Sequence, residues 1–117
     1  MSSEQILTVN FFRSPSGNEP VREWLKDRGR DERKLIGEDI MLVQFRWPLG
    51  LPLVRKMESD LWEVRSKLVS GNISRVFFTI KNKEMILLHA MIKKSQKTPK
   101  KDIDLARSRK NQWLSEV

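Results

Sequence analysis

Cysteine is absent from the 117 residues of this protein, and histidine occurs only once. Without thiols the chain can form neither a disulfide framework nor a zinc site with thiolate ligands, and a single imidazole cannot build a histidine cluster. The sequence also lacks a phosphate-binding glycine loop, a Ser-His-Asp set with meaningful spacing and an acidic cluster for a metal. The fold must therefore form by packing alone, and we expect no cofactor and no metal.

Long hydrophobic runs are missing as well. No apolar stretch approaches the roughly 18 to 20 residues that are needed to span a bilayer. The first residues, MSSEQ, lack the basic segment followed by an apolar segment that marks a secretory signal. With 117 residues and a hydrophobic content of 38%, the chain is expected to form one domain, residues 1–117, with a single modest core. We expect a cytoplasmic protein that does not contact a membrane.

Positive charge, in contrast, is abundant. Lys and Arg number 23 against 15 Asp and Glu, so the formal net charge is +8. Such a charge favours a polyanionic partner. It is concentrated in residues 93–110, which contain eight basic and two acidic residues and therefore contribute +6. A solvated helix face would explain such a run, and so would a surface for nucleic acid or for an acidic protein.

A first strand and two helices are expected in the N-terminal half. Residues 7–12 (LTVNFF) are rich in strand formers and are followed by a cluster of turn residues. Asn18 is expected to cap a short helix that extends to Gly29, and Asp31 to cap a second helix that ends before Pro48. Neither helix has an apolar stripe wide enough to be stable alone, so we expect a helical hairpin that packs on a sheet.

From residue 51 onward apolar and polar residues alternate, which predicts the strands of an antiparallel meander. The expected strands are residues 53–57, 61–66, 73–80 and 84–92. A final helix is expected from Lys100, with an apolar side of Ile103, Ala106, Trp113 and Leu114 and its basic residues elsewhere. The predicted class is α+β, with an N-terminal strand and a two-helix hairpin packed on a curved antiparallel sheet and a C-terminal helix.

Three charged residues are expected to gather on one face of this sheet. Alternation places Glu63 and Arg65 on the face opposite Trp62, and if the neighbouring strands pair through Gly71, Arg75 lies within a few ångströms of both. One interpretation is an ordinary surface ion pair, worth about 0.2 to 1 kcal/mol. The other is RNA cleavage, in which guanidinium groups neutralise the scissile phosphate and a carboxylate or an amine moves the 2′-hydroxyl proton. The spacing is compatible with both.

His89 is expected to share a face with Met85, Leu87 and Met91. It can act as a general acid or base near neutral pH, or it can be a core or edge histidine that donates to a backbone carbonyl. Residues 93–99 form a basic loop that can hold a phosphate backbone, although loop lysines are often simply solvated. The tryptophans are interpreted as core residues, namely Trp24, Trp47, Trp62 and Trp113.

Several short segments carry a further signal through their order and spacing. They are residues 16–21 (SGNEPV), 50–56 (GLPLVRK), 60–65 (DLWEVR), 74–78 (SRVFF), 87–94 (LLHAMIKK) and 97–99 (KTP), with Ala106 beyond. Together they resemble the phage-derived, HigB-like branch of the RelE/ParE toxin superfamily. The resemblance covers nearly the whole chain, and it implies the RelE-like arrangement of two N-terminal helices on a curved antiparallel sheet.

The resemblance also implies a toxin of a type II toxin–antitoxin pair, held inactive by a cognate antitoxin encoded in an adjacent gene. RelE-like toxins cut mRNA in the ribosomal A site without a metal, through attack by the 2′-hydroxyl. On this basis Arg65 and Arg75 match positions that bind and activate the phosphate, and Arg75→Ala is expected to abolish growth arrest while leaving the fold intact. Lys93 or Lys94 falls near another expected basic position at the end of the last strand. Glu63, which stands where better-known members have lysine, is the expected proton acceptor.

His89 is carried over as a further catalytic candidate, because a histidine is frequent there in this branch. The expected RNA-binding residues are Lys93, Lys97, Lys56, Lys100 and Lys101. The chain departs from some ribosome-dependent members in having no tyrosine to stack on mRNA, so Trp113 or a phenylalanine would have to substitute. Two alternatives follow from the same scaffold: a gyrase-binding toxin of the ParE kind without nuclease activity, and an inactive prophage-derived RNA-binding protein.

Overall fold

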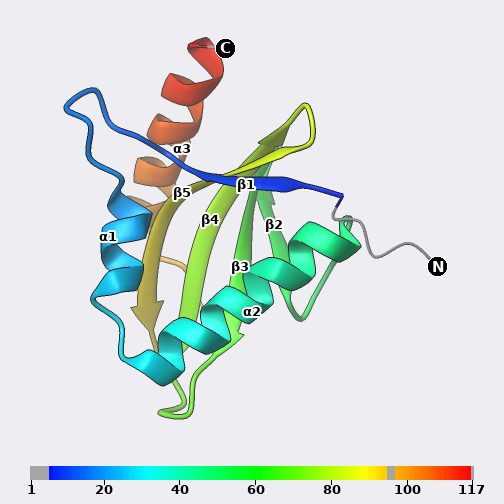
Figure 1. Ribbon diagram of the computed structural model, residues 1–117, viewed down its shortest axis with the longest axis vertical. Helices are drawn as coiled ribbons and strands as arrows, with labels where there is room; N and C mark the ends of the chain where they lie inside the picture. Colours follow the sequence, from blue (N-terminus) through cyan, green and yellow to red (C-terminus); the bar gives the residue numbers. More distant parts are fainter. Residues whose placement is uncertain (1–5, 95–96, 117) are drawn as a thin grey trace.

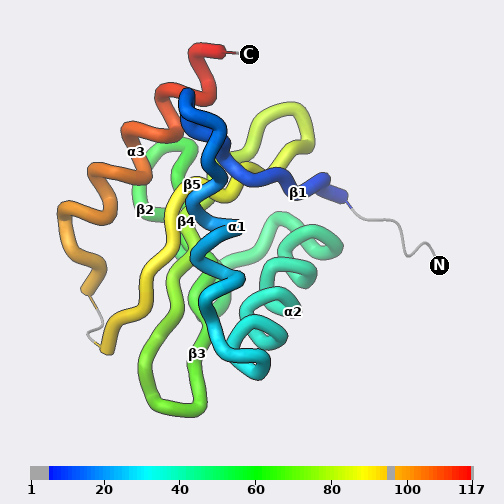
Figure 2. The backbone as a smooth tube through the Cα atoms, turned by 60° about the vertical axis from the view of Figure 1, so that its left-hand side comes forward, coloured from blue at the N-terminus to red at the C-terminus, as the bar shows by residue number. Residues whose placement is uncertain are grey.

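A computed structural model of the protein describes residues 6–94 and 97–116. A twisted sheet forms its middle layer, with two helices on one face and one helix on the other (Figures 1 and 2). The elements are β1 (Thr8–Phe11), α1 (Pro20–Lys26), α2 (Arg30–Arg46), β2 (Val54–Glu58), β3 (Leu61–Lys67), β4 (Ile73–Lys81), β5 (Glu84–Lys93) and α3 (Lys100–Ser115). The expected α+β class and the expected order of elements are confirmed.

The sheet has the strand order β1-β5-β4-β3-β2. Strands β2 to β5 form the expected antiparallel meander, and Asn82 and Lys83 make its last turn with φ angles of 52° and 65°. Positive φ at both central residues is the geometry that matches the right-handed twist of a hairpin. β1 differs, because it pairs in parallel with β5. The chain between these two strands runs through α1, α2 and the other three strands, and this length permits a parallel pairing. The sheet is therefore mixed and mostly antiparallel.

The helices α1 and α2 cover one face of the sheet, as expected of the helical hairpin. Their buried side chains join the apolar side chains of the strands in one core, which includes Val21, Ile36, Ile40, Val43, Val64, Val76, Phe78, Met85 and Leu87. Trp62 stacks on Phe78 with ring centroids 5.8 Å apart, and Trp47 meets both rings edge-on. These two tryptophans therefore contribute to packing, as predicted.

Both predicted helix caps are wrong by one or two residues. Glu19 precedes the first residue of α1, and Gly29 precedes the first residue of α2, so Asp31 lies in the first turn. Asn18 is used elsewhere, because its backbone N–H and carbonyl both bond to Ser14 and close the preceding loop. Pro20 then begins α1, since its missing N–H is not needed in a first turn.

The helix α3 covers the other face of the sheet, over a second core that contains Phe77, Leu88 and Ala106. The expectation that its basic residues avoid the packed side is wrong for Arg109 and Lys110. Lys110 Nζ donates to the carbonyl of Ser59 at 3.0 Å, and Arg109 Nη1 donates to the carbonyl of Leu88 at 2.8 Å. Long basic side chains can pack along apolar surface while their charged ends reach backbone oxygens. Polar contacts therefore help to hold α3 on the sheet.

A β-bulge changes the predicted face of His89. Phe77 pairs with His89 and Phe78 pairs with Leu87, so Leu88 is an extra residue in β5. The insertion breaks the alternation at this point, and Met85 and Leu87 face α1 and α2, whereas His89 faces α3 with Met91. The predicted grouping of His89 with Met85 and Leu87 is therefore wrong, and its grouping with Met91 is right.

Candidate functional site

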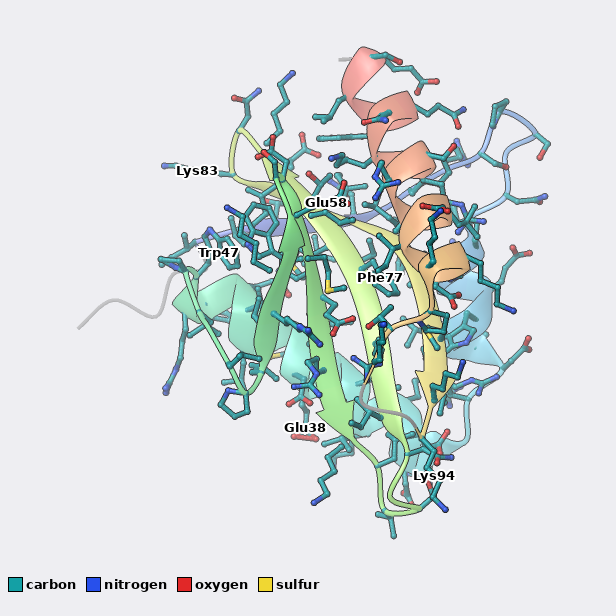
Figure 3. All side chains as sticks on the ribbon, turned by 180° about the vertical axis from the view of Figure 1, so that it is seen from behind. Glu38, Trp47, Glu58, Phe77, Lys83 and Lys94 are labelled. Atoms are coloured by element: carbon teal, nitrogen blue, oxygen red, sulfur yellow. The ribbon has the colours of Figure 1, made fainter. Side chains whose placement is uncertain are left out.

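A cleft of about 590 Å³ opens at one end of the sheet, on the same face as α3. Its lining combines three cationic side chains with an apolar wall. The lining residues are Pro52, Leu53, Arg65, Lys67, Gly71, Ile73 and Lys94. Figure 3 shows Lys94 at this end of the sheet, whereas Glu58 and Lys83 lie at the other end. Among the described residues that line the cleft, none carries a negative charge.

Strand alternation and a hairpin bring these cations together. Arg65 and Lys67 lie two residues apart on β3, so their side chains project from the same face. The β3–β4 hairpin turns at Gly71, whose φ of 92° is in the left-handed region that favours glycine. β5 then runs back beside β4 and ends with Lys93 opposite Ile73, which delivers Lys94 to the cleft. The β3–β4 hairpin and the end of β5, more than 20 residues apart in the sequence, thus contribute to one site.

Glu63, Arg65 and Arg75 meet on this face, as the alternation predicted. Arg75 lies directly across from Arg65, and its Nη1 donates to Glu63 Oε1 at 2.8 Å. Arg65 Nε is 3.6 Å from the same oxygen. The side chains of Glu63 and Arg75 are both 0% exposed, so the interpretation as an ordinary surface ion pair is wrong. The cluster is a buried ion pair with a second guanidinium above it.

Thr98 closes the cluster from the side of α3. Its Oγ1 donates to Glu63 Oε2 at 3.2 Å, and Thr98 itself is buried. Both carboxylate oxygens of Glu63 are therefore engaged within the protein. The Arg65 side chain remains 17% exposed and lines the cleft, whereas Arg75 does not reach it. Of the two arginines predicted to contact a phosphate, Arg65 is the one placed to do so in this conformation.

His89 lies outside the cleft and helps to attach α3. Its Nε2 is 2.7 Å from Asp102 Oδ1, and its ring stacks on Phe77 with centroids 5.6 Å apart. Burial lowers the pKa of His89 below its usual value of 6.5, and the hydrogen bond and charge of Asp102 only partly oppose this effect. Figure 3 shows Phe77 between the sheet and α3. The arrangement matches the interpretation of a satisfied, half-buried histidine, although its partner is a carboxylate and not a backbone carbonyl.

The basic residues of 93–110 fall into two groups, those engaged with other residues around α3 and those exposed to solvent. Arg107 forms ion pairs with Glu58 at 2.6 Å and with Asp104 at 2.9 Å, and Arg109 and Lys110 are engaged under α3. The hydrogen bond from Arg107 lowers the pKa of Glu58. The exposed basic side chains of this run are Lys93, Lys94, Lys97, Lys100 and Lys101. They flank residues 95–96 of the predicted basic loop, which lie outside the described residues.

Lys56 does not join the other predicted RNA-binding residues. It pairs with Trp62 in the β2–β3 ladder and so belongs to the face that α1 and α2 cover. Its neighbour Arg55 pairs with Glu63 and therefore lies on the face of the cleft. Period-two alternation in residues 53–57 contained this information, because Arg55 and Lys56 must point to opposite faces.

Four residues that line the site or support the elements around it were not predicted from the sequence. Lys67 continues the alternation of Glu63 and Arg65, so the strand pattern could have revealed it. Leu53 joins the site because its carbonyl accepts a hydrogen bond from the Arg65 amide at 2.8 Å. Thr98 and Asp102 were not recognisable, since only the docking of α3 brings them to Glu63 and His89.

Within residues 6–94 and 97–116, no three His, Cys, Asp or Glu side chains gather where they could hold a metal ion. None of the helices in these ranges has the length and apolar character required to cross a bilayer.

Comparison with known proteins identifies the family of the chain. A search of curated proteins found no match. A family model described as "Phage derived protein Gp49-like (DUF891)" matches residues 23–111, which include α2, the whole meander and most of α3. This family belongs to the RelE/HigB toxin-like group. The cleft, the buried Glu63–Arg75 pair and the docked start of α3 all lie inside the match, and the chain belongs to the phage-derived Gp49-like family.

Proposed function

We propose that this protein is the toxin of a type II toxin–antitoxin pair and that it cleaves mRNA on the ribosome without a metal ion. The observation that carries the proposal is the convergence of Arg65, Lys67 and Lys94 on one cleft in a chain of the Gp49-like family. Cations suit the phosphates of RNA, and the apolar wall of Pro52 and Leu53 offers a surface on which a base can pack.

The proposed reaction is an in-line transesterification. The substrate's 2′-hydroxyl oxygen attacks the adjacent phosphorus, and the bond from phosphorus to the 5′ oxygen of the next nucleotide breaks. The products are a 2′,3′-cyclic phosphate and a 5′-hydroxyl. Arg65 stabilises the charge that develops on the phosphate, and Lys94 gives a proton to the leaving 5′ oxygen. The proton of the 2′-hydroxyl passes to water in the open cleft.

Arg75 and Glu63 are positioning residues in this proposal. Glu63 Oε1 contacts both guanidinium groups, so Arg75 fixes the carboxylate and the carboxylate orients Arg65 toward the cleft. Both oxygens of Glu63 already accept hydrogen bonds, from Arg75 and from Thr98. The geometry therefore favours a positioning role for Glu63 over that of proton acceptor. His89 acts at a greater distance, by holding the start of α3 and with it Thr98.

The proposed partner is a cognate antitoxin that places acidic side chains over the cleft. Lys94 lines the cleft, and it would attract them together with the exposed lysines that surround it in the sequence, Lys93, Lys97, Lys100 and Lys101. Interfaces of this kind weaken as salt rises, because exposed charges are screened. The proposal of this partner fails if the product of the adjacent gene does not bind the protein at low salt.

The test is mapping of 5′ ends of mRNA in a purified translation reaction, with and without the protein. We expect new ends inside codons that carry a 5′-hydroxyl and that require ribosomes. Arg65→Ala and Lys94→Ala should each slow cleavage, by about 10² to 10³-fold for a charge-stabilising group. Lys26→Ala is the matched control, since Lys26 is an exposed lysine on α1 and should not affect the rate.

The other outcomes separate the alternatives. Intact mRNA under conditions where the protein still arrests growth would overturn the nuclease assignment and favour a binding toxin of the gyrase-inhibiting kind. Intact mRNA with no growth arrest would favour an inactive scaffold. Cleavage that Lys26→Ala slows as much as Lys94→Ala would show that general charge, and not the cleft, determines the rate.

A further inference from the structure

The outward side of α2 exposes three large apolar side chains in its last turns. Met41 is 54% exposed, Leu42 41% and Phe45 40%. Met41 and Phe45 are four residues apart and therefore lie on the same side of the helix. Ile6 is also exposed, and its backbone N–H bonds to the carbonyl of Gln44, so it lies beside this end of α2. These four side chains, Ile6, Met41, Leu42 and Phe45, are called the α2 patch below.

The protein's own fold does not need the α2 patch. The opposite side of α2 packs on the sheet through Ile36, Ile40 and Val43, and these residues are already buried. Soluble monomers rarely expose several large apolar side chains side by side unless the surface contacts a partner. The α2 patch also lies on the opposite face of the sheet from the cleft, as Figures 1 and 2 show for α2 and α3.

Two charged residues flank the α2 patch without a partner in the described chain. Within residues 6–94 and 97–116, neither Glu38 nor Arg46 forms an ion pair. They have opposite charges and are eight residues apart in α2, so they are separated by about 12 Å along the helix axis. Leu42 lies midway between them.

We propose that the α2 patch binds a second copy of this chain, with the two α2 helices antiparallel across a two-fold axis near Leu42. A two-fold axis makes every contact occur twice and requires the surface to complement itself. Around Leu42, antiparallel α2 helices bring Glu38 level with Arg46 of the second copy, and Arg46 level with its Glu38. The apolar side chains meet in the centre, and two identical ion pairs form at the rim.

The distribution of charge favours a second copy of this basic chain despite its net charge of +8. The exposed lysines of residues 93–101 lie at the end of β5, between β5 and α3, and at the start of α3, and α3 lies on the far side of the sheet from α2. Repulsion across the interface is therefore reduced by distance and by salt. Both clefts of the dimer face outward and stay open. The inference is independent of the proposed nuclease function.

Sedimentation velocity across a concentration series tests the dimer directly. We expect concentration-dependent dimerisation of the unmodified chain. Leu42→Lys should raise the dimer Kd by about tenfold or more, because two charges would meet at the axis. The matched control is Leu105→Lys, since Leu105 on α3 is 39% exposed, close to the 41% of Leu42, and should leave the dimer unchanged.

Charge reversal tests the antiparallel geometry. Glu38→Arg alone and Arg46→Glu alone should each raise the dimer Kd by about tenfold, because each change creates two like-charge contacts. The double variant should recover most of the affinity, since it restores both ion pairs with reversed signs. Both positions are exposed, so circular dichroism should show an unchanged fold for all three variants.

The proposal is overturned if the chain stays monomeric at the highest concentration it tolerates. It is also overturned if a dimer forms but neither Leu42→Lys nor the charge reversals weaken it. A monomeric chain that binds the product of the adjacent gene through Leu42 would assign the α2 patch to that protein instead. None of these measurements depends on mRNA cleavage. A failure of the dimer proposal can therefore be distinguished from a failure of the proposed nuclease function.

Discussion

Replacing Glu63 with leucine should destabilise this protein far more than the loss of a surface ion pair would. Glu63 and Arg75 are both 0% exposed, and their charged atoms are 2.8 Å apart. Glu63→Leu leaves the Arg75 guanidinium buried beside Arg65 with no carboxylate to compensate it. Removing one partner of a buried pair typically costs about 3 to 5 kcal/mol. That loss is large against a total stability of about 5 to 15 kcal/mol for an ordinary domain.

Urea unfolding followed by tryptophan fluorescence measures this cost. With a slope of about 1 to 3 kcal/mol per molar urea, the midpoint of Glu63→Leu should fall by roughly 1 to 5 M. The control is Arg22→Ala, which breaks the exposed Arg22–Glu19 ion pair of α1 and should cost less than about 1 kcal/mol. The double variant Glu63→Leu with Arg75→Met should recover most of the stability, because no buried charge pair remains to be split.

A cost for Glu63→Leu as small as that of Arg22→Ala would refute the reasoning, since it would mean that water reaches the pair. A double variant no more stable than Glu63→Leu would show that the uncompensated charge is not the cause. The burial also revises one expectation from sequence. Arg75→Ala should weaken the fold as well as the activity, so its cleavage rate must be compared at equal folded fraction.

Two further predictions concern His89 and a pair of glycines. Because the pKa of His89 is lowered in the folded state mainly by burial, the unfolded chain binds its proton first, and stability should fall as pH drops below about 6.5. His89→Gln keeps a hydrogen-bond donor for Asp102 but removes the titrating group. The urea midpoints of this variant at about pH 7.5 and about pH 5.5 should therefore differ less than those of the unmodified chain. An equal difference would exclude His89 as the cause. A Cβ at Gly37 or at Gly71 would meet nothing within 4 Å, but only Gly71 has a positive φ, of 92°. In thermal unfolding, Gly37→Ala should be about 1 kcal/mol more stable than the unmodified chain and Gly71→Ala about 1 to 2 kcal/mol less stable. A stability change of the same sign in both variants would contradict this argument from the backbone conformation.

Local pattern was sufficient to predict most of the secondary structure. Strands β3 and β4 differ from the predicted ranges of 61–66 and 73–80 only by one added residue at the end. The prediction was this close because alternation and turn residues are properties of short segments. The helix caps failed for a related reason, since Asn18 can bond to a helix or to Ser14 and the sequence does not rank the two. The parallel pairing of β1 with β5 was not predictable from either strand, because it depends on where α1 and α2 return the chain.

The candidate site was likewise predictable from the sequence only in part. Period two was enough to place Glu63 and Arg65 on one face and to bring Arg75 next to them across the hairpin. The bulge at Leu88 was invisible to this argument, and it turned His89 toward α3. An inserted residue is set by how the sheet twists and packs, and not by the residues that flank it.

The sequence by itself determined a basic protein with no thiol chemistry, its strands and helices, and the three charged residues that share a sheet face. Tertiary structure alone decided which of them meet solvent. Burial depends on what packs over a face. Thr98 contacts Glu63 just before α3, and Glu63 and Arg75 are fully buried while Arg65 lines the cleft. The cleft itself exists because β3, the β3–β4 hairpin and the end of β5 converge in space, and that convergence is a property of the whole sheet.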